Sequence, residues 1–178
     1  MSAGSRQLRD EMARQRVVAR SRTYRVAVGR ALRVQVAGGV FHITSRGNRG
    51  QTIYNDDDDR IVFLLMRNRV LQRFGWRQMA YCLMTNHFHL LIQTPEPNLS
   101  AGIHRLNGGY AAYFNERHWL AGHLFERRFW SRQVETERDL HGVLDYIASN
   151  PVRAGLCERP SQWRWSSFYR TLDPRYAR

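Results

Sequence analysis

The stretch Asn86-His87-Phe88-His89-Leu90-Leu91-Ile92 places two histidines around one apolar residue inside a hydrophobic run. In an extended strand, side chains two residues apart point to the same face of the sheet. His87 and His89 therefore project side by side, while the apolar residues that alternate with them point the other way, into a core. The pattern predicts a strand that presents two imidazoles to one divalent metal ion.

Charge is the second informative feature of the chain. Its 178 residues carry a formal net charge of +13, and every basic residue is Arg. This excess is typical of proteins that bind a polyphosphate, of which nucleic acid is the commonest. The guanidinium group suits that partner because it grips phosphate bidentately and stacks on bases.

The composition also excludes several classes of protein. The two cysteines, Cys82 and Cys157, are too few for a disulfide framework or a zinc cluster, and we interpret them as core residues. No run approaches the ~20 apolar residues of a membrane span. The N-terminus lacks the apolar segment of a secretory signal. We therefore expect a cytoplasmic protein with no membrane partner.

Hydrophobic periodicity and turn residues divide the chain into a basic arm, residues 1–33, and one folded domain, residues 34–178. Strands are expected at residues 40–45, 76–83, 87–93 and 123–135. Helices are expected at residues 56–74, capped by Asn55, and at residues 138–150. A further helix, capped by Asn98, is expected to carry its apolar stripe from Leu99 to Tyr113. The predicted fold class is α+β: a ferredoxin-like antiparallel sheet (split βαβ) with helices on one face and an additional C-terminal helix.

The last of these helices carries an unusual tyrosine. Its apolar stripe centres near Leu140 and Leu144, and Tyr146 falls about 120° away from that centre. Asn150 lies one turn further on, at the spacing where helical side chains meet. A tyrosine off the core stripe with an amide beneath it is not typical of a packing residue.

Together these motifs closely resemble the REP-associated tyrosine transposases, single-tyrosine members of the HUH superfamily. The resemblance is carried by His87-Phe88-His89, by Asp145-Tyr146-Ile147 and by the segment 150–156. Residues 40–49 and 122–129 look like the other landmarks of this family. The resemblance runs from about residue 40 to residue 168.

The resemblance implies a role for each of these side chains. His87 and His89, with Asn150 as third protein ligand, would bind Mg²⁺ or Mn²⁺. Tyr146 would be the nucleophile that attacks a phosphodiester of single-stranded DNA, leaving a 5′-phosphotyrosine and a free 3′-OH. Because the covalent link conserves the bond energy, a later 3′-OH can reverse the step and join strands. Residues 34–178 would then be the catalytic domain, acting near hairpin DNA.

Six further residues are candidates for DNA contacts. Each carries a side chain that can bind phosphate, from one of two segments: the turn after the first strand and the predicted fourth strand. They are Arg46, Asn48, Arg49, Arg127, Arg128 and Arg132.

Three questions stay open at this stage. The same fold without chemistry would make a DNA-binding regulator, and an RNA-binding module of ferredoxin-like topology is a further alternative, although its paired-aromatic signature is absent. An imidazole site would also attract Zn²⁺. We expect a monomer, with a dimer that exchanges tyrosine helices as the alternative.

Overall fold

The computed structural model describes residues 35–169, so the predicted basic arm lies outside the described residues. The elements follow in the order β1 (Val40–Arg46), η1 (Asn48–Gly50), α2 (Asp57–Phe74), β2 (Arg77–Leu83), β3 (His87–Gln93), α3 (Leu99–Arg117), β4 (Trp130–Val134), α4 (Glu137–Arg153) and η2 (Pro160–Gln162). The strands form one antiparallel sheet in the order β2-β3-β1-β4. The predicted α+β fold with a split βαβ order is confirmed.

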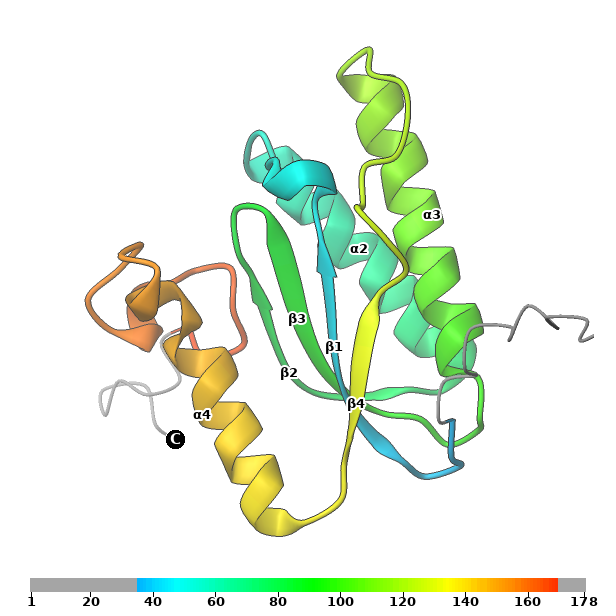
Figure 1. The fold of residues 1–178 in the computed structure, drawn as a ribbon, viewed down its shortest axis with the longest axis vertical. Helices are drawn as coiled ribbons and strands as arrows, with labels where there is room; N and C mark the ends of the chain where they lie inside the picture. The colour runs from blue at the N-terminus through cyan, green and yellow to red at the C-terminus, as the bar shows by residue number, and fades with distance from the viewer. Residues whose placement is uncertain (1–34, 170–178) are drawn as a thin grey trace, which may run out of the picture. The chain divides into compact units, whose positions relative to one another are not determined.

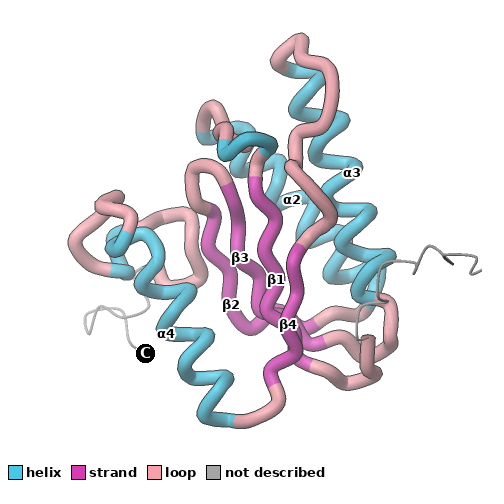
Figure 2. The backbone as a smooth tube through the Cα atoms, in the orientation of Figure 1, coloured by secondary structure: helices cyan, strands magenta, loops and turns pink. Residues whose placement is uncertain are grey.

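Helices cover both faces of this sheet, as Figures 1 and 2 show: α2 and α3 lie on one side and α4 on the other. The alternation of side chains along β3 explains the two layers. Phe88, Leu90 and Ile92 belong to the larger core under α2 and α3. Leu91 belongs to the smaller core under α4, together with Ile147 of that helix. The α4 face is therefore the face onto which His87 and His89 project.

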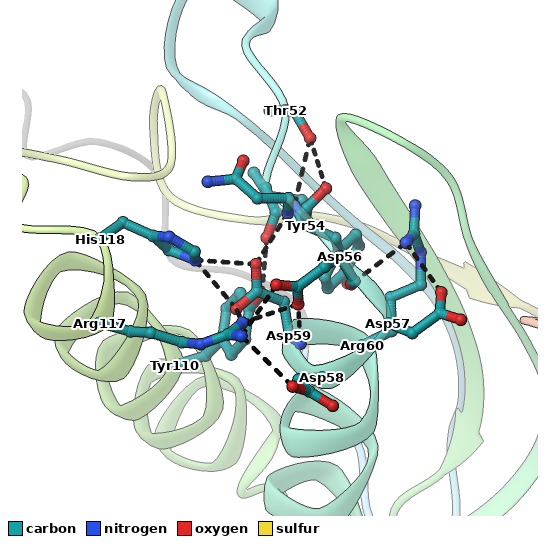
Figure 3. A network of polar contacts seen from close by, with 12 residues as sticks. Thr52, Tyr54, Asp56, Asp57, Asp58, Asp59, Arg60, Tyr110, Arg117 and His118 are labelled. Atoms are coloured by element: carbon teal, nitrogen blue, oxygen red, sulfur yellow. Dashed lines mark hydrogen bonds and ion pairs between the residues drawn. The ribbon is translucent and has the colours of Figure 1, made fainter.

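An ionic network joins the start of α2 to the end of α3 (Figure 3). The fully buried carboxylate of Asp59 accepts hydrogen bonds from the backbone N–H of Asn55 at 2.7 Å and from Arg117 at 2.5 Å. It also pairs with Nε2 of His118 at 2.9 Å. The acidic first turn of α2 thus links the two helices as well as satisfying the positive end of the helix dipole.

Three predicted boundaries were wrong. The N-cap of α2 is Asp56 and not Asn55, because the Asp56 carboxylate accepts from the backbone N–H of Asp59. The helix α4 does not stop at Asn150 but continues through the buried Pro151 to Arg153. A proline so near the end removes one backbone donor, and the hydrogen bond from Ala154 N–H to the Asn150 carbonyl, 3.0 Å, still forms after it.

The fourth strand is also shorter than predicted. It covers only Trp130–Val134, and the preceding residues form a loop. That loop pairs with the far end of β1 instead: Glu126 N–H donates to the Arg46 carbonyl at 3.0 Å, and Phe125 forms an isolated bridge with Gly47. Arg127 and Arg128 therefore lie on a loop and not on a strand.

Candidate active site

A pocket of about 700 Å³ opens on the α4 face of the sheet. Its walls come from β1, β3, β4 and α4. Its lining residues are His42, Thr44, Arg46, Asn86, His87, His89, Trp130, Arg132, Asp139, Gly142, Val143 and Tyr146. The pocket thus brings together two predicted metal ligands, the predicted nucleophile and two of the predicted DNA-contacting arginines.

The two imidazoles of β3 lie next to each other in this pocket. The ring centroids of His87 and His89 are 4.9 Å apart, and the planes are almost perpendicular, at 89°. His89 is only 3 % exposed, and its Nε2 makes no hydrogen bond to any described residue. A buried imidazole nitrogen without a partner is available as a metal ligand.

The hydrogen bond of His87 identifies its tautomer. Its Nδ1 lies 2.7 Å from Oδ1 of Asn86, and the amide nitrogen of Asn86 donates to the Gly50 carbonyl at 2.9 Å. Because an amide oxygen can only accept, Nδ1 of His87 carries the hydrogen. The lone pair is then left on Nε2, which is the arrangement that supports metal-ligating histidines in known sites.

The support of His89 comes from β1. Its Nδ1 lies 3.0 Å from the hydroxyl of Thr44, the residue directly opposite in the strand pairing, and 3.1 Å from Nε2 of His42. Either partner can accept a hydrogen from Nδ1, and in that tautomer the lone pair of His89 lies on Nε2. Sequence reasoning missed His42, Thr44 and Asn86 as parts of the site. The alternation along residues 40–46 could have placed His42 and Thr44 on one face, but not opposite His89.

Burial keeps these imidazoles neutral. Burial, and then the charge of Arg132, lower the pKa of His42 to about 4, although Asp139 opposes the shift. Burial and the two neighbouring histidines lower the pKa of His89 to about 2. Burial and then Arg46 lower the pKa of His87 as well. A neutral imidazole is the form that binds metal, so the site is ready for a cation at neutral pH.

The helix α4 carries Tyr146 to these histidines. Its ring centroid lies 5.5 Å from that of His89 and 5.8 Å from that of His42, edge to face in both cases. The side chain keeps 42 % of its surface exposed, so a substrate can reach it. The next residue, Ile147, is fully buried in the core under α4 and holds the helix in place.

Asn150 follows one turn later but is not among the residues that line the pocket. Its side-chain nitrogen donates to the backbone carbonyl of Tyr146 at 2.8 Å. Among residues 35–169, no three His, Cys, Asp or Glu side chains are grouped as metal ligands. The amide oxygen of Asn150, which is not used in that hydrogen bond, is a candidate donor besides the two imidazoles.

The predicted DNA-contacting residues fall into separate places. Arg46 and Arg132 line the active-site pocket, where Arg132 also pairs with Asp139 at 2.9 Å. Asn48 and Arg49 form the short η1 turn. Arg127 and Arg128 line a second pocket beside α3.

The fold and the site define a class of α+β proteins in which a tyrosine from a separate helix faces a histidine pair on an antiparallel sheet. Residues 36–150 match the family "Transposase IS200 like". The chain belongs to this family.

Curated relatives support the resemblance to REP-associated tyrosine transposases. A Haemophilus influenzae protein with that name is 30 % identical over 112 residues, which cover 57 % of this chain and 64 % of the relative. The REP-associated tyrosine transposase of Escherichia coli (strain K12) is 33 % identical over 49 residues, 28 % of this chain and 30 % of the relative. The chain thus spans less than two thirds of the length of either relative.

A solved structure shares the fold. It is described as a REP-associated tyrosine transposase bound to a REP hairpin, and it matches with a TM-score of 0.67 over 79 % of this chain and 83 % of that one. The sequence identity is 22 %, so the match concerns the fold alone. Within residues 35–169, no helix is long and apolar enough to cross a membrane.

Proposed function

We propose that this protein is a single-stranded DNA nickase and strand transferase that acts next to a hairpin through a covalent link to Tyr146. One observation carries the proposal: the Tyr146 ring lies 5.5 Å from the His89 ring, inside the pocket that also contains His87. A phenol beside neutral imidazoles and two arginines has little use in a packed core. It suits the transfer of a phosphoryl group.

The reaction follows from the groups that line the pocket. The oxygen of Tyr146 gives up its proton and forms a bond to the phosphorus of a DNA phosphodiester. The bond from that phosphorus to the 3′-oxygen breaks, and this oxygen takes up a proton to become a free 3′-OH. The strand that follows is left on Tyr146 as a 5′-phosphotyrosine. Attack by a 3′-OH runs the same exchange backwards and rejoins DNA.

The remaining residues position the strand. Arg46 and Arg132 offer positive charge to its phosphates, and the half-exposed ring of Trp130 offers a surface on which a base can stack. Arg153 lies with its guanidinium carbon 5.8 Å from the centre of the Tyr146 ring, where it adds positive charge next to the phenol. These groups attract a negatively charged strand to the nucleophile.

A divalent cation, Mg²⁺ or Mn²⁺, belongs to this proposal. His87 and His89 would bind it through Nε2, with Asn150 as a third ligand through its amide oxygen. When bound, such an ion withdraws charge from a non-bridging oxygen and stabilises the leaving 3′-oxygen. The buried, unpartnered Nε2 of His89 and the fixed tautomer of His87 support this assignment.

The hairpin partner is supported by two observations of different kinds. The curated relatives are named for REP elements, and the matching solved structure holds a REP hairpin. In this chain, the net charge of +13 favours a polyphosphate partner independently of those names. We therefore propose hairpin DNA with a single-stranded flank as the substrate.

Covalent capture tests the proposal. Hairpin oligonucleotides with flanks, labelled at the 3′ end, are incubated with the protein and Mn²⁺ and run on a denaturing gel. The label should migrate with the protein, whereas a label at the 5′ end should appear on a shortened free strand. The adduct should be lost in Tyr146→Phe and with a chelator, but kept in the control Tyr113→Phe.

Two results would contradict the proposal. An adduct that persists in Tyr146→Phe would assign the nucleophile to another residue. DNA binding without an adduct on any flanked hairpin would favour the alternative function, a DNA-binding regulator that kept the fold and lost the chemistry.

A further inference from the structure

A second pocket, which we call the α3 pocket, lies on the opposite face of the sheet from the active site. It has a volume of about 830 Å³ and is enclosed by α3 and by residues 122–129 of the loop before β4. It shares no lining residue with the active-site pocket. Nothing in the proposed reaction uses it.

The α3 pocket is large enough to admit a flat ring, and much of its lining is apolar. Its apolar walls include Leu124, Phe125 and Phe129 from the loop. On the helix side the lining includes His104 and Asn107 beside small residues, and a Cβ atom added at Gly108 would meet no atom within 4 Å. The space in front of Gly108 is therefore open.

One side chain of the lining, that of Asn107, is held by a hydrogen bond to β1. The side-chain nitrogen of Asn107 donates to the Ser45 hydroxyl at 2.8 Å, but its oxygen is buried and accepts no hydrogen bond from any described residue. Leaving such an acceptor unpaired is unfavourable. Because this oxygen is buried, it is not offered to a ligand in the α3 pocket.

The rim of the α3 pocket is positively charged. Arg127 and Arg128 lie at its edge, and the one acidic residue of the lining, Glu126, is paired with Arg127 at 3.2 Å. An apolar pocket with guanidinium groups at its edge is complementary to a nucleotide: the base enters the pocket and its phosphate meets the arginines.

The backbone connects this pocket to the active site. Along β1, Ser45 contacts Asn107, while its neighbours Thr44 and Arg46 line the active-site pocket. At the start of the edge strand β4, Phe129 lines the α3 pocket and the adjacent Trp130 lines the active site. A single strand that crosses the edge of β4 past Trp130 would therefore reach both pockets.

We infer that the α3 pocket binds one unpaired base of the single-stranded flank and thereby sets where the strand is cut. This inference rests on the proposed function, because it needs single-stranded DNA in the active site. It adds a recognition site on the other face of the sheet.

A larger side chain placed in the α3 pocket tests the inference. Gly108→Leu should block the pocket, while the neighbouring Gly109→Leu is a matched control: Gly109 is also exposed on α3 with open space around it, but it does not line the pocket. Leu is the better helix former, so both variants should fold at least as stably as the parent. Affinity is measured by fluorescence anisotropy in the full-length Tyr146→Phe protein, which should leave the strand intact.

Gly108→Leu should weaken binding of a flanked hairpin about tenfold, the typical loss of one stacked base, and leave binding of the same hairpin without a flank unchanged. Gly109→Leu should change neither. When the bases of the flank are removed one at a time, one abasic position should lower the affinity of the parent about tenfold. The same abasic position should not lower the affinity of Gly108→Leu.

The inference is overturned if an abasic site lowers the affinity of the parent and of Gly108→Leu by the same factor. It is also overturned if Gly108→Leu weakens binding of the hairpin without a flank as much as binding of the flanked hairpin. Adduct formation by the protein with an intact Tyr146 on the same DNA is scored in parallel. An adduct together with an unaffected Gly108→Leu variant overturns the inference and leaves the proposed function standing. Absence of any adduct counts against the proposed function itself.

Discussion

Removing the residues that hold the two imidazoles should weaken Mn²⁺ binding to unequal degrees. His87 has one partner at Nδ1, the Asn86 amide oxygen at 2.7 Å. His89 has two, the Thr44 hydroxyl at 3.0 Å and Nε2 of His42 at 3.1 Å. Loss of such a supporting hydrogen bond typically costs 10- to 100-fold in metal affinity, roughly 1.4 to 3 kcal/mol.

The number of hydrogen-bond partners at each Nδ1 decides how much Mn²⁺ affinity each variant should lose. Asn86→Ala leaves His87 without support, so we expect about a 100-fold loss. Thr44→Val keeps the volume and leaves His42 in place for His89, so we expect about a tenfold loss, and the double variant with His42→Phe should lose about 100-fold. Asn86→Asp keeps an acceptor oxygen and should stay within about tenfold of the parent.

Isothermal titration of Mn²⁺ into the metal-free protein measures these affinities without any DNA. Thr52→Val is the matched control, because the Thr52 hydroxyl donates to the Tyr54 carbonyl and does not line the pocket. The reasoning is refuted if Asn86→Ala binds Mn²⁺ like the parent, or if Thr52→Val loses as much as Thr44→Val.

Two further predictions concern stability. Asp59→Ala should lower the free energy of unfolding, measured by urea denaturation, by about 3 kcal/mol, since it removes the buried partner of a charged network. The control Asp58→Ala removes a side chain that is 74 % exposed and should lower it by less than about 1 kcal/mol. Equal losses in the two variants would contradict this prediction. The metal-free protein should also lose stability as the pH falls below 6.5. In the unfolded chain His42 and His89 then take up protons. In the folded protein they stay unprotonated, because their pKa values are about 4 and about 2. By pH 5 this amounts to about 2 kcal/mol for each histidine, and urea midpoints that are equal at pH 7 and pH 5 would argue against it.

Local sequence patterns predicted the helices and strands, and they predicted where His87, His89 and Tyr146 lie on these elements. The alternation of residues 86–92 placed His87 and His89 on one face, because side-chain direction in a strand depends only on the residue spacing. The angular position of Tyr146 on α4 followed in the same way from helical geometry. Both are properties of a single segment.

The missing parts of the site depend on contacts between distant segments. Thr44 supports His89 because β1 pairs with β3 in one register, and no local pattern states that register. Arg127 and Arg128 were assigned to a strand over residues 123–135, but they lie on a loop that pairs with β1. The continuation of α4 through Pro151, which is buried, was not expected either, because proline removes a backbone donor and usually ends a helix.

The site of covalent attachment tests the central claim most directly. DNA captured by the full-length protein with Mn²⁺ is digested with nuclease, and the protein is cleaved into peptides for tandem mass spectrometry. The account predicts a nucleotide joined through its 5′-phosphate to the peptide that contains Tyr146, and to no other tyrosine. A nucleotide on Tyr110 or Tyr113, or capture that leaves Tyr146 unmodified, would contradict it.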